Sequence, residues 1–273
     1  MTIRFRRFIF WVFAAFFIIA SIIISFLAQG YGFDFNFFRI VKTGGIFIKT
    51  SQSGAKIYIN DKFIKETEGL LNYSRLVSGL VPGRYNVFVY KEGYYPWNKT
   101  IEVKSGLVAE IDYLLLFPLK FQKVKVADEL ISNVKFSAQD GPASGWKVAT
   151  SSAEIISPDK NKKLYISNNK ILIEYLKDEK EEPVKKIGET ELISEYEPPI
   201  KFLDWLGDSE HIVWFSNNEL SIAERDNYGG KRNIIKFYLN IASPVYFDRE
   251  NSDFYFFENA GKKEILYKIN LEI

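Results

Sequence analysis

The sequence predicts an all-β protein that follows a single N-terminal transmembrane helix. Three observations support this fold class. The chain opens with a long uncharged apolar segment, its middle part alternates apolar and polar residues, and its second half contains similar stretches about 45 residues apart. Aromatic residues make up 16 % of the chain, which favours strands. We expect a small β-sandwich followed by a partial β-propeller-like array of about three blades.

Residues 1–30 predict a cytoplasmic tip and a transmembrane signal-anchor helix. The segment from Phe8 to Leu27 carries no charge, and at about 1.5 Å per residue it spans a hydrocarbon core of about 30 Å. Arg4, Arg6 and Arg7 precede it, which predicts a cytoplasmic N-terminus and an extracytoplasmic bulk. The alternative is a signal peptide cleaved near residues 28–30. The apolar segment is longer than a usual signal-peptide core of about 7–15 residues, so we expect a retained anchor in the cell membrane.

The composition limits the chemistry of the chain. It has 273 residues, no cysteine, one histidine and a formal net charge of +2. Disulfides and cysteine metal sites are excluded, and a histidine-based metal site or triad is disfavoured. The near balance of acidic and basic residues gives no reason to expect nucleic acid as a partner. We therefore predict no cofactor, no metal site and no catalytic residues.

Residues 31–43 are interpreted as a linker, and residues 44–118 as a small β domain. Apolar residues alternate with polar ones in several short runs, which is typical of strands with one buried face. Turn sequences such as Pro82-Gly83 and Glu92-Gly93 separate these runs. The predicted inward residues are Ile46, Ile48, Ala55, Ile57, Ile59, Tyr85, Val87, Val89, Ile101, Val103, Ala109, Ile111 and Tyr113.

This stretch resembles a PEGA domain, a β module of the cell envelope. The segment Gly79–Tyr85 matches the Leu-x-Pro-Gly-x-Tyr turn of that family, and Lys91–Tyr94 matches its Lys-x-Gly-Tyr turn. The Pro and Glu of the name-giving signature are absent, since Gln52-Ser53-Gly54-Ala55 stands in its place. The resemblance covers about a quarter of the chain and implies a fold rather than an activity.

Three aromatic residues after Gly93 are candidates for ligand binding. Tyr94, Tyr95 and Trp97 are candidates to form a stacking platform for a sugar or a peptide. The interpretation that we favour is that they cap the core of the β domain.

Residues 119–273 contain the repeated β units. Each unit reads strand, acidic turn, strand, polar turn, strand, and Ser167-Asn168-Asn169 recurs as Ser216-Asn217-Asn218. Ser157-Pro158-Asp159-Lys160 resembles the Ser-Pro-Asp-Gly turn of WD-repeat-like blades in periplasmic propellers. A fourth fragment is predicted in 119–134. Three arrangements stay open: a compact open stack on the PEGA-like domain, which we favour, a ring completed by other chains, and a shortened member of a longer family.

Several motifs are candidates for a catalytic or metal-binding role, and each also has a structural interpretation. Ser132–Lys135 fits a Ser-x-x-Lys pattern, but its flanks predict strand. Glu181 and Glu182 are adjacent and cannot converge on a strand. The charged segment Lys177–Lys186 is interpreted as a solvated hairpin tip. His211 is expected to lie at a strand edge with a local hydrogen bond. Asp159, Asp208 and Asp253 are expected to form Asx-type turns rather than a Ca²⁺ site.

We therefore expect a membrane-anchored extracytoplasmic binding or scaffolding protein of the bacterial cell envelope, not an enzyme. Its expected partners are the membrane, through the N-terminal helix, and an envelope protein, peptide or glycan. One alternative is a cell-wall-associated enzyme or its regulatory subunit. Another is a structural protein that self-associates through its strand edges.

Overall fold

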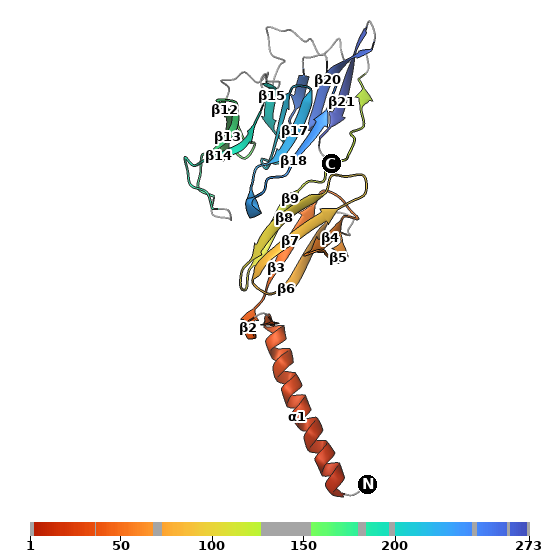
Figure 1. The fold of residues 1–273 in the computed structure, drawn as a ribbon, viewed down its shortest axis with the longest axis vertical. Helices are drawn as coiled ribbons and strands as arrows, with labels where there is room; N and C mark the ends of the chain where they lie inside the picture. Colours follow the sequence, from red (N-terminus) through yellow and green to blue (C-terminus); the bar gives the residue numbers. More distant parts are fainter. Residues whose placement is uncertain are drawn as a thin grey trace. The chain divides into compact units, whose positions relative to one another are not determined.

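The computed structural model describes residues 3–35, 37–67, 73–126, 154–179, 184–196, 200–241, 245–260 and 263–271. The chain forms two compact units. Unit 1 comprises Met1–Val87 and Thr100–Leu114, and unit 2 comprises Phe88–Lys99 and Leu115–Ile273. After one helix the described elements are almost all strands, which confirms the predicted fold class (Figure 1).

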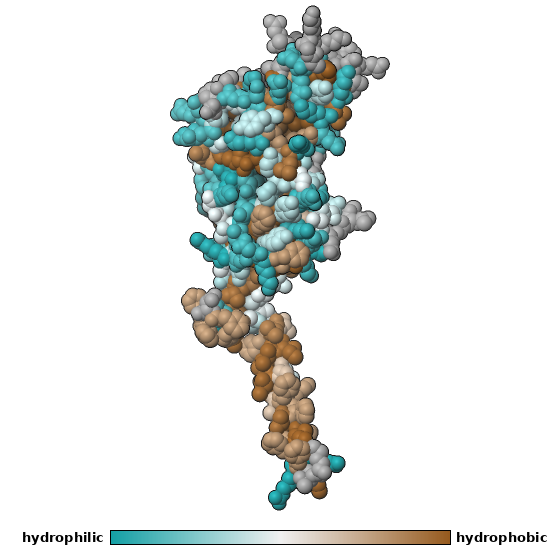
Figure 2. All heavy atoms as spheres, turned by 45° about the vertical axis from the view of Figure 1, so that its right-hand side comes forward, coloured by the Kyte–Doolittle hydropathy of each residue, from teal (hydrophilic) through white to brown (hydrophobic). Residues whose placement is uncertain are grey.

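The chain begins with α1 (Ile3–Ala28), a helix of 26 residues with no buried side chain. It is long and apolar enough to cross a membrane, and Figure 2 shows its hydrophobic surface. The same length and composition also suit a signal sequence. Gly30, with φ +81°, ends the helix in the left-handed conformation that glycine adopts without steric cost.

Residues 31–42 form a β-hairpin of β1 (Tyr31–Asp34) and β2 (Arg39–Lys42). The segment interpreted as a linker therefore contains two paired strands. In β1 the aromatic residues alternate with Gly32 and Asp34, but β2 shows no such alternation. Each strand has only four residues, so this pattern was too short to locate the hairpin. Both the backbone N–H and the hydroxyl of Thr43 donate to the carbonyl of Gly30, each at 2.8 Å.

The β domain consists of two sheets. One has the order β6-β3-β9, in which β3 (Gly44–Thr50) pairs antiparallel with β6 (Ser74–Leu80) and parallel with β9 (Val108–Leu114). The other has the order β5-β4-β7-β8. Its strands are β4 (Lys56–Ile59), β5 (Lys62–Glu66), β7 (Gly83–Tyr90) and β8 (Trp97–Val103).

Most of the predicted inward positions of this domain are buried. In unit 1 these are Ile46, Ile48, Ala55, Ile57, Ile59, Val87, Ile101 and Val103. The strands β5 and β6 were not predicted. Their side chains are exposed or half-buried along the whole strand, so their sequences lack a regular apolar side.

Unit 2 contains three four-stranded antiparallel sheets (Figure 1). The first sheet is β11 (Ile155–Ile156), β12 (Lys162–Ser167), β13 (Lys170–Tyr175) and β14 (Thr190–Glu195). The second is β15 (Ile200–Trp205), β16 (His211–Ser216), β17 (Glu219–Glu224) and β18 (Ile234–Tyr238). The third is β19 (Val245–Asp248), β20 (Asp253–Ala260), β21 (Lys263–Asn270) and β10 (Val124–Lys125). A short 3-10 turn, η1 (Tyr228–Gly230), precedes β18.

The second sheet is the central layer of unit 2. All six residues of β16 are buried, because its two faces pack against different neighbours. Ile212 and Trp214 join the apolar core shared with the first sheet, which includes Trp205. Val213 and Phe215 join the core shared with the third sheet. The continuous apolar sequence of β16 is therefore typical of a strand buried on both faces.

The repeated Ser-Asn-Asn sequences form equivalent hairpin turns. Asn168 and Asn169 connect β12 to β13, and Asn217 and Asn218 connect β16 to β17. All four have φ between 47° and 61°, which two-residue hairpin turns of type I′ require and which asparagine tolerates better than most residues.

The predicted fourth fragment has a different place. Its described part includes β10, which pairs with β21 and completes the third sheet. Val124 lies opposite Lys268, and the N–H of Val126 donates to Leu266. Residues 127–134 lie outside the described part of the chain.

Candidate functional site

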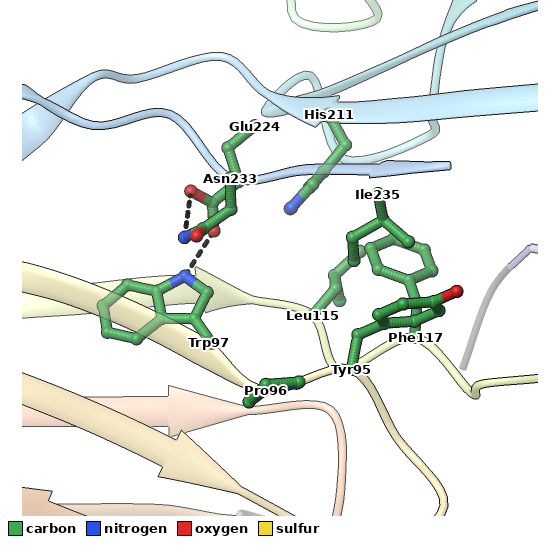
Figure 3. Close-up of a pocket in the computed structure, with 9 residues that line it drawn as sticks. All are labelled: Tyr95, Pro96, Trp97, Leu115, Phe117, His211, Glu224, Asn233 and Ile235. Carbon is green, nitrogen blue, oxygen red and sulfur yellow. Dashed lines mark hydrogen bonds between the residues drawn. The ribbon is translucent and has the colours of Figure 1, made fainter. Parts of the chain in front are cut away.

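A small pocket in unit 2 brings together two buried ionisable residues, His211 and Glu224. Its cavity volume is about 10 Å³, room for about one water molecule. Figure 3 shows the side chains that line it, drawn from the segment before β8, the segment after β9, and the strands and loops of the second sheet. The lining residues are Tyr95, Pro96, Trp97, Leu115, Phe117, His211, Glu224, Asn233 and Ile235.

The carboxylate of Glu224, at the end of β17, is the hydrogen-bonding centre of this pocket. Its Oε1 accepts a hydrogen bond from the indole N–H of Trp97 (Figure 3). Its Oε2 accepts one from the Asn233 amide at 3.1 Å and lies 2.7 Å from the Lys99 ammonium. Such a buried carboxylate is stable only because charged and polar donors replace the lost water.

Lys99 extends this cluster to a second carboxylate. Its ammonium is buried and lies 2.7 Å from Oδ1 of Asp226, which also accepts the backbone N–H of Tyr228. Burial alone would raise the pKa of Asp226, but the Lys99 ammonium, the backbone N–H of Tyr228 and the charge of Arg225 together outweigh burial, and the net pKa is lowered. Lys99 is therefore shared by the carboxylates of Glu224 and Asp226.

His211, the first residue of β16, also lines the pocket. Its Nδ1 lies 2.5 Å from Asp208 Oδ2, whereas its buried Nε2 has no hydrogen-bond partner among the described residues. In Figure 3 the imidazole points into the pocket. Burial would lower the pKa of His211, but Asp208, with help from Glu224 and Glu210, raises it above the ordinary value. The imidazole is thus favoured in its charged form, and the expected local hydrogen bond is present.

The three aromatic residues predicted as a platform do not share one exposed face. Trp97 is only 4 % exposed and is bound to Glu224. The half-buried Tyr95 packs edge-on against Phe237 at 5.4 Å between ring centroids. The half-buried Tyr94 lies below the Lys91 ammonium at 4.8 Å. Tyr95 and Trp97 contribute to the pocket, but as packed walls rather than as an open stacking surface.

A second charged cluster connects the first two sheets of unit 2. The buried Lys162 ammonium lies 3.1 Å from carboxylate oxygens of Asp159 and Glu210, and 3.3 Å from Glu179. Arg225 pairs with the same Glu210 at 2.7 Å and the same Glu179 at 2.9 Å. Burial and the nearby Arg225 would lower the pKa of Lys162, but the carboxylates around it, Glu210 foremost, together outweigh them and the net pKa is raised.

This cluster adds a detail to one interpretation of the sequence. The segment Lys177–Lys186 was expected to be solvated, and most of its described residues are exposed, but Glu179 and Lys185 are half-buried. Glu179 joins the Lys162 cluster, and Lys185 is paired with Glu189 at 2.9 Å and with the buried Glu191 at 3.1 Å. Glu181 and Glu182 lie outside the described residues.

The aspartates of the acidic turns are engaged locally. Asp159 accepts from the N–H of Asn161, and Asp208 accepts from the N–H of Glu210, so both form the expected Asx-type turns. Asp253 instead lies on β20 and pairs with Lys268, and Asp248 makes the turn of the third sheet. No grouping suited to a metal ion occurs among the described residues. The Ser132–Lys135 motif lies outside them.

The pocket is smaller than the roughly 300–1,000 Å³ of typical small-molecule sites. Its polar atoms mainly form hydrogen bonds and ion pairs between residues 88–99 and the second sheet. Sequence reasoning missed Glu224, Lys99 and Asn233, because each stands in an ordinary strand or loop sequence and acquires its role only through contacts over long sequence distances.

The described residues form an N-terminal apolar helix followed by β-sheets, with a buried charged cluster in unit 2. Comparison with known protein families assigns one part of this chain to a family. Residues 43–116 match the PEGA domain, which confirms the resemblance. The match covers about a quarter of the chain and describes the β domain alone. A search of curated proteins finds no match to this chain.

Proposed function

We propose that this chain is a membrane-anchored extracytoplasmic binding or scaffolding protein of the bacterial cell envelope. The unburied apolar helix α1 and the PEGA match support the anchor and the location. The three sheets of unit 2 support a partial propeller-type array as the binding part.

The observation that carries the binding role is an apolar row across the first sheet of unit 2. Tyr165, Leu172 and Leu192 lie opposite one another on β12, β13 and β14. They alternate with the buried Leu164, Ile171 and Ile173, so they belong to the face turned away from the central sheet. Leu192 is 43 % exposed, and Ile156 on β11 is 41 % exposed. Exposed apolar side chains grouped on one sheet face favour a protein or peptide partner.

A non-catalytic role is part of this proposal. The buried ionisable groups of unit 2 are engaged with one another across strands and sheets, as Lys162 and Glu224 are, and this arrangement serves the fold. Self-association is the second candidate, because the same apolar row also suits a second copy of the chain.

The absence of cysteine makes single-thiol experiments direct. We expect a cysteine at the exposed Lys62 to react with a membrane-impermeant maleimide in intact cells, and one at Thr2 to react only after permeabilisation. The full-length mass in the washed membrane fraction distinguishes an anchor from a cleaved signal peptide. The reverse labelling pattern would refute the topology.

For the binding role, a cysteine at Leu192 carrying a photo-crosslinker is expected to form an adduct in membranes, and the same probe at Lys62 is not. An adduct of twice the chain mass supports self-association, and a different defined mass supports another partner. Equal weak labelling from both positions would contradict the binding face.

A further inference from the structure

The hairpin β1–β2 carries an unusual set of exposed aromatic side chains. Its connecting residues include Phe35, Phe37 and Phe38, which are 77 %, 71 % and 80 % exposed. Phe33 is 43 % exposed and packs against Phe35 and Phe38 at 4.9 and 6.2 Å between ring centroids. Figure 2 shows this hydrophobic surface continuing from the end of α1 onto the hairpin.

The aromatic tip is held by a buried carboxylate. Asp34 is buried and accepts hydrogen bonds from the backbone N–H of Phe37 and from Nε of Arg39, both at 3.4 Å. Phe38 has φ +50°, a conformation that costs free energy for a residue with a large side chain. The apolar residues are thus presented to the outside by a defined turn.

The base of the hairpin is fixed to the end of α1. Gly30, just after the helix, accepts both hydrogen bonds of Thr43, just after β2. The ring of Tyr31 contacts that of Phe26 in the last turn of the helix at 5.7 Å. Strands of four residues extend about 10 Å, so the tip stays within about 10–15 Å of the helix end. Figure 1 shows β2 level with that end.

We propose that the β1–β2 hairpin is a second membrane contact, which inserts its phenylalanine side chains into the interface of the leaflet where α1 ends. The headgroup region on each side of a bilayer is about 5–8 Å thick, so a tip held within about 10–15 Å of the helix end can reach it. Aromatic side chains are enriched at this depth. The guanidinium of Arg39, over the ring of Phe37 at 5.0 Å, is placed to meet lipid phosphates.

This inference rests on the proposed anchor and adds a function to the segment that follows it. An anchor helix alone leaves the β domain free to tilt about its end. A hairpin bonded to the helix and seated in the interface would restrict this tilt.

The test uses single-cysteine variants of the full chain in phosphatidylcholine–phosphatidylglycerol vesicles, labelled with a nitroxide. Collisions with oxygen, which is enriched in lipid, are compared with collisions with a water-soluble nickel chelate. The test positions are Phe35 and Phe37, the anchor control is Ala20, and the water control is Lys62. The oxygen-to-nickel ratio at both test positions is expected to be several-fold above that at Lys62 and below that at Ala20.

Two results would overturn the proposal while leaving the anchor intact: a ratio equal to that at Lys62, which means water, or low collision rates with both reagents, which means a protein contact. A water-like ratio at Ala20 would instead show that the anchor fails. If one labelled variant does not fold, the other test position still decides the question, since both side chains leave the same turn.

Discussion

His211 makes the stability of unit 2 depend on pH. Its pKa is raised in the folded state because Asp208, Glu224 and Glu210 outweigh the effect of burial. The stabilisation is therefore complete below the unfolded pKa of about 6.5 and is lost as pH rises through the higher folded pKa. The pKa of Asp208 is lowered, so its contribution is present above the unfolded value and is lost as pH falls through the folded one.

We predict that urea midpoints of the wild-type chain decrease between about pH 6 and about pH 9, and that this decrease is smaller in His211→Asn. Asparagine retains a donor near Asp208 but cannot be charged. Parallel curves for both proteins over this range would show that His211 does not carry the pH dependence.

At the scale of elements, the charged cluster between the first and second sheets is expected to contribute to their association. Lys162 is buried and meets three carboxylates, two of which come from outside its own turn. Removing one charged member of a buried ionic cluster leaves the opposite charges buried without a partner, which is destabilising.

We predict that Lys162→Met lowers the free energy of unfolding by about 3 kcal/mol. The matched control is Lys163→Met, on the opposite face of the same strand, where pairs with Glu154 and Glu174 lie near solvent. There the expected loss is below about 1 kcal/mol. Denaturant unfolding of both variants measures the difference. Equal losses of unfolding free energy would mean that the buried cluster stabilises the chain no more than the ion pairs near solvent do.

The elements also show how far local pattern predicts structure. Alternation located Ile57 and Val87 because each strand there has one buried side. It did not locate β5 or β6, whose side chains are exposed on both faces. It could not indicate that Trp97 would be bound to Glu224, since the two residues are 127 positions apart.

At the scale of the whole molecule, the third sheet of unit 2 is completed by β10, a strand that precedes the first sheet along the sequence. β10 pairs with β21, so the beginning and the end of the repeat region are joined in one sheet. This pairing closes a very long loop, whose entropy cost the apolar core of the unit must offset.

We predict that a disulfide between Val124→Cys and Lys268→Cys, which replace directly opposed residues, stabilises the chain by up to about 4 kcal/mol. Thermal unfolding with and without reductant measures the effect, and the native chain has no other thiol to interfere. The control is Val124→Cys alone, which should be insensitive to reductant. An unchanged or lower midpoint in the oxidised form would contradict the pairing of β10 with β21.

The sequence by itself determined the apolar helix, the turns at Asn168–Asn169 and Asn217–Asn218, the one-sided strands and the PEGA-like segment. All of these depend on residues that are neighbours along the chain. Only the tertiary structure decided that residues 31–42 form an aromatic hairpin and that Lys99, Glu224 and His211 meet at one pocket. The physical reason is that pairing of buried charges and completion of sheets depend on contacts over long sequence distances, which no local periodicity records.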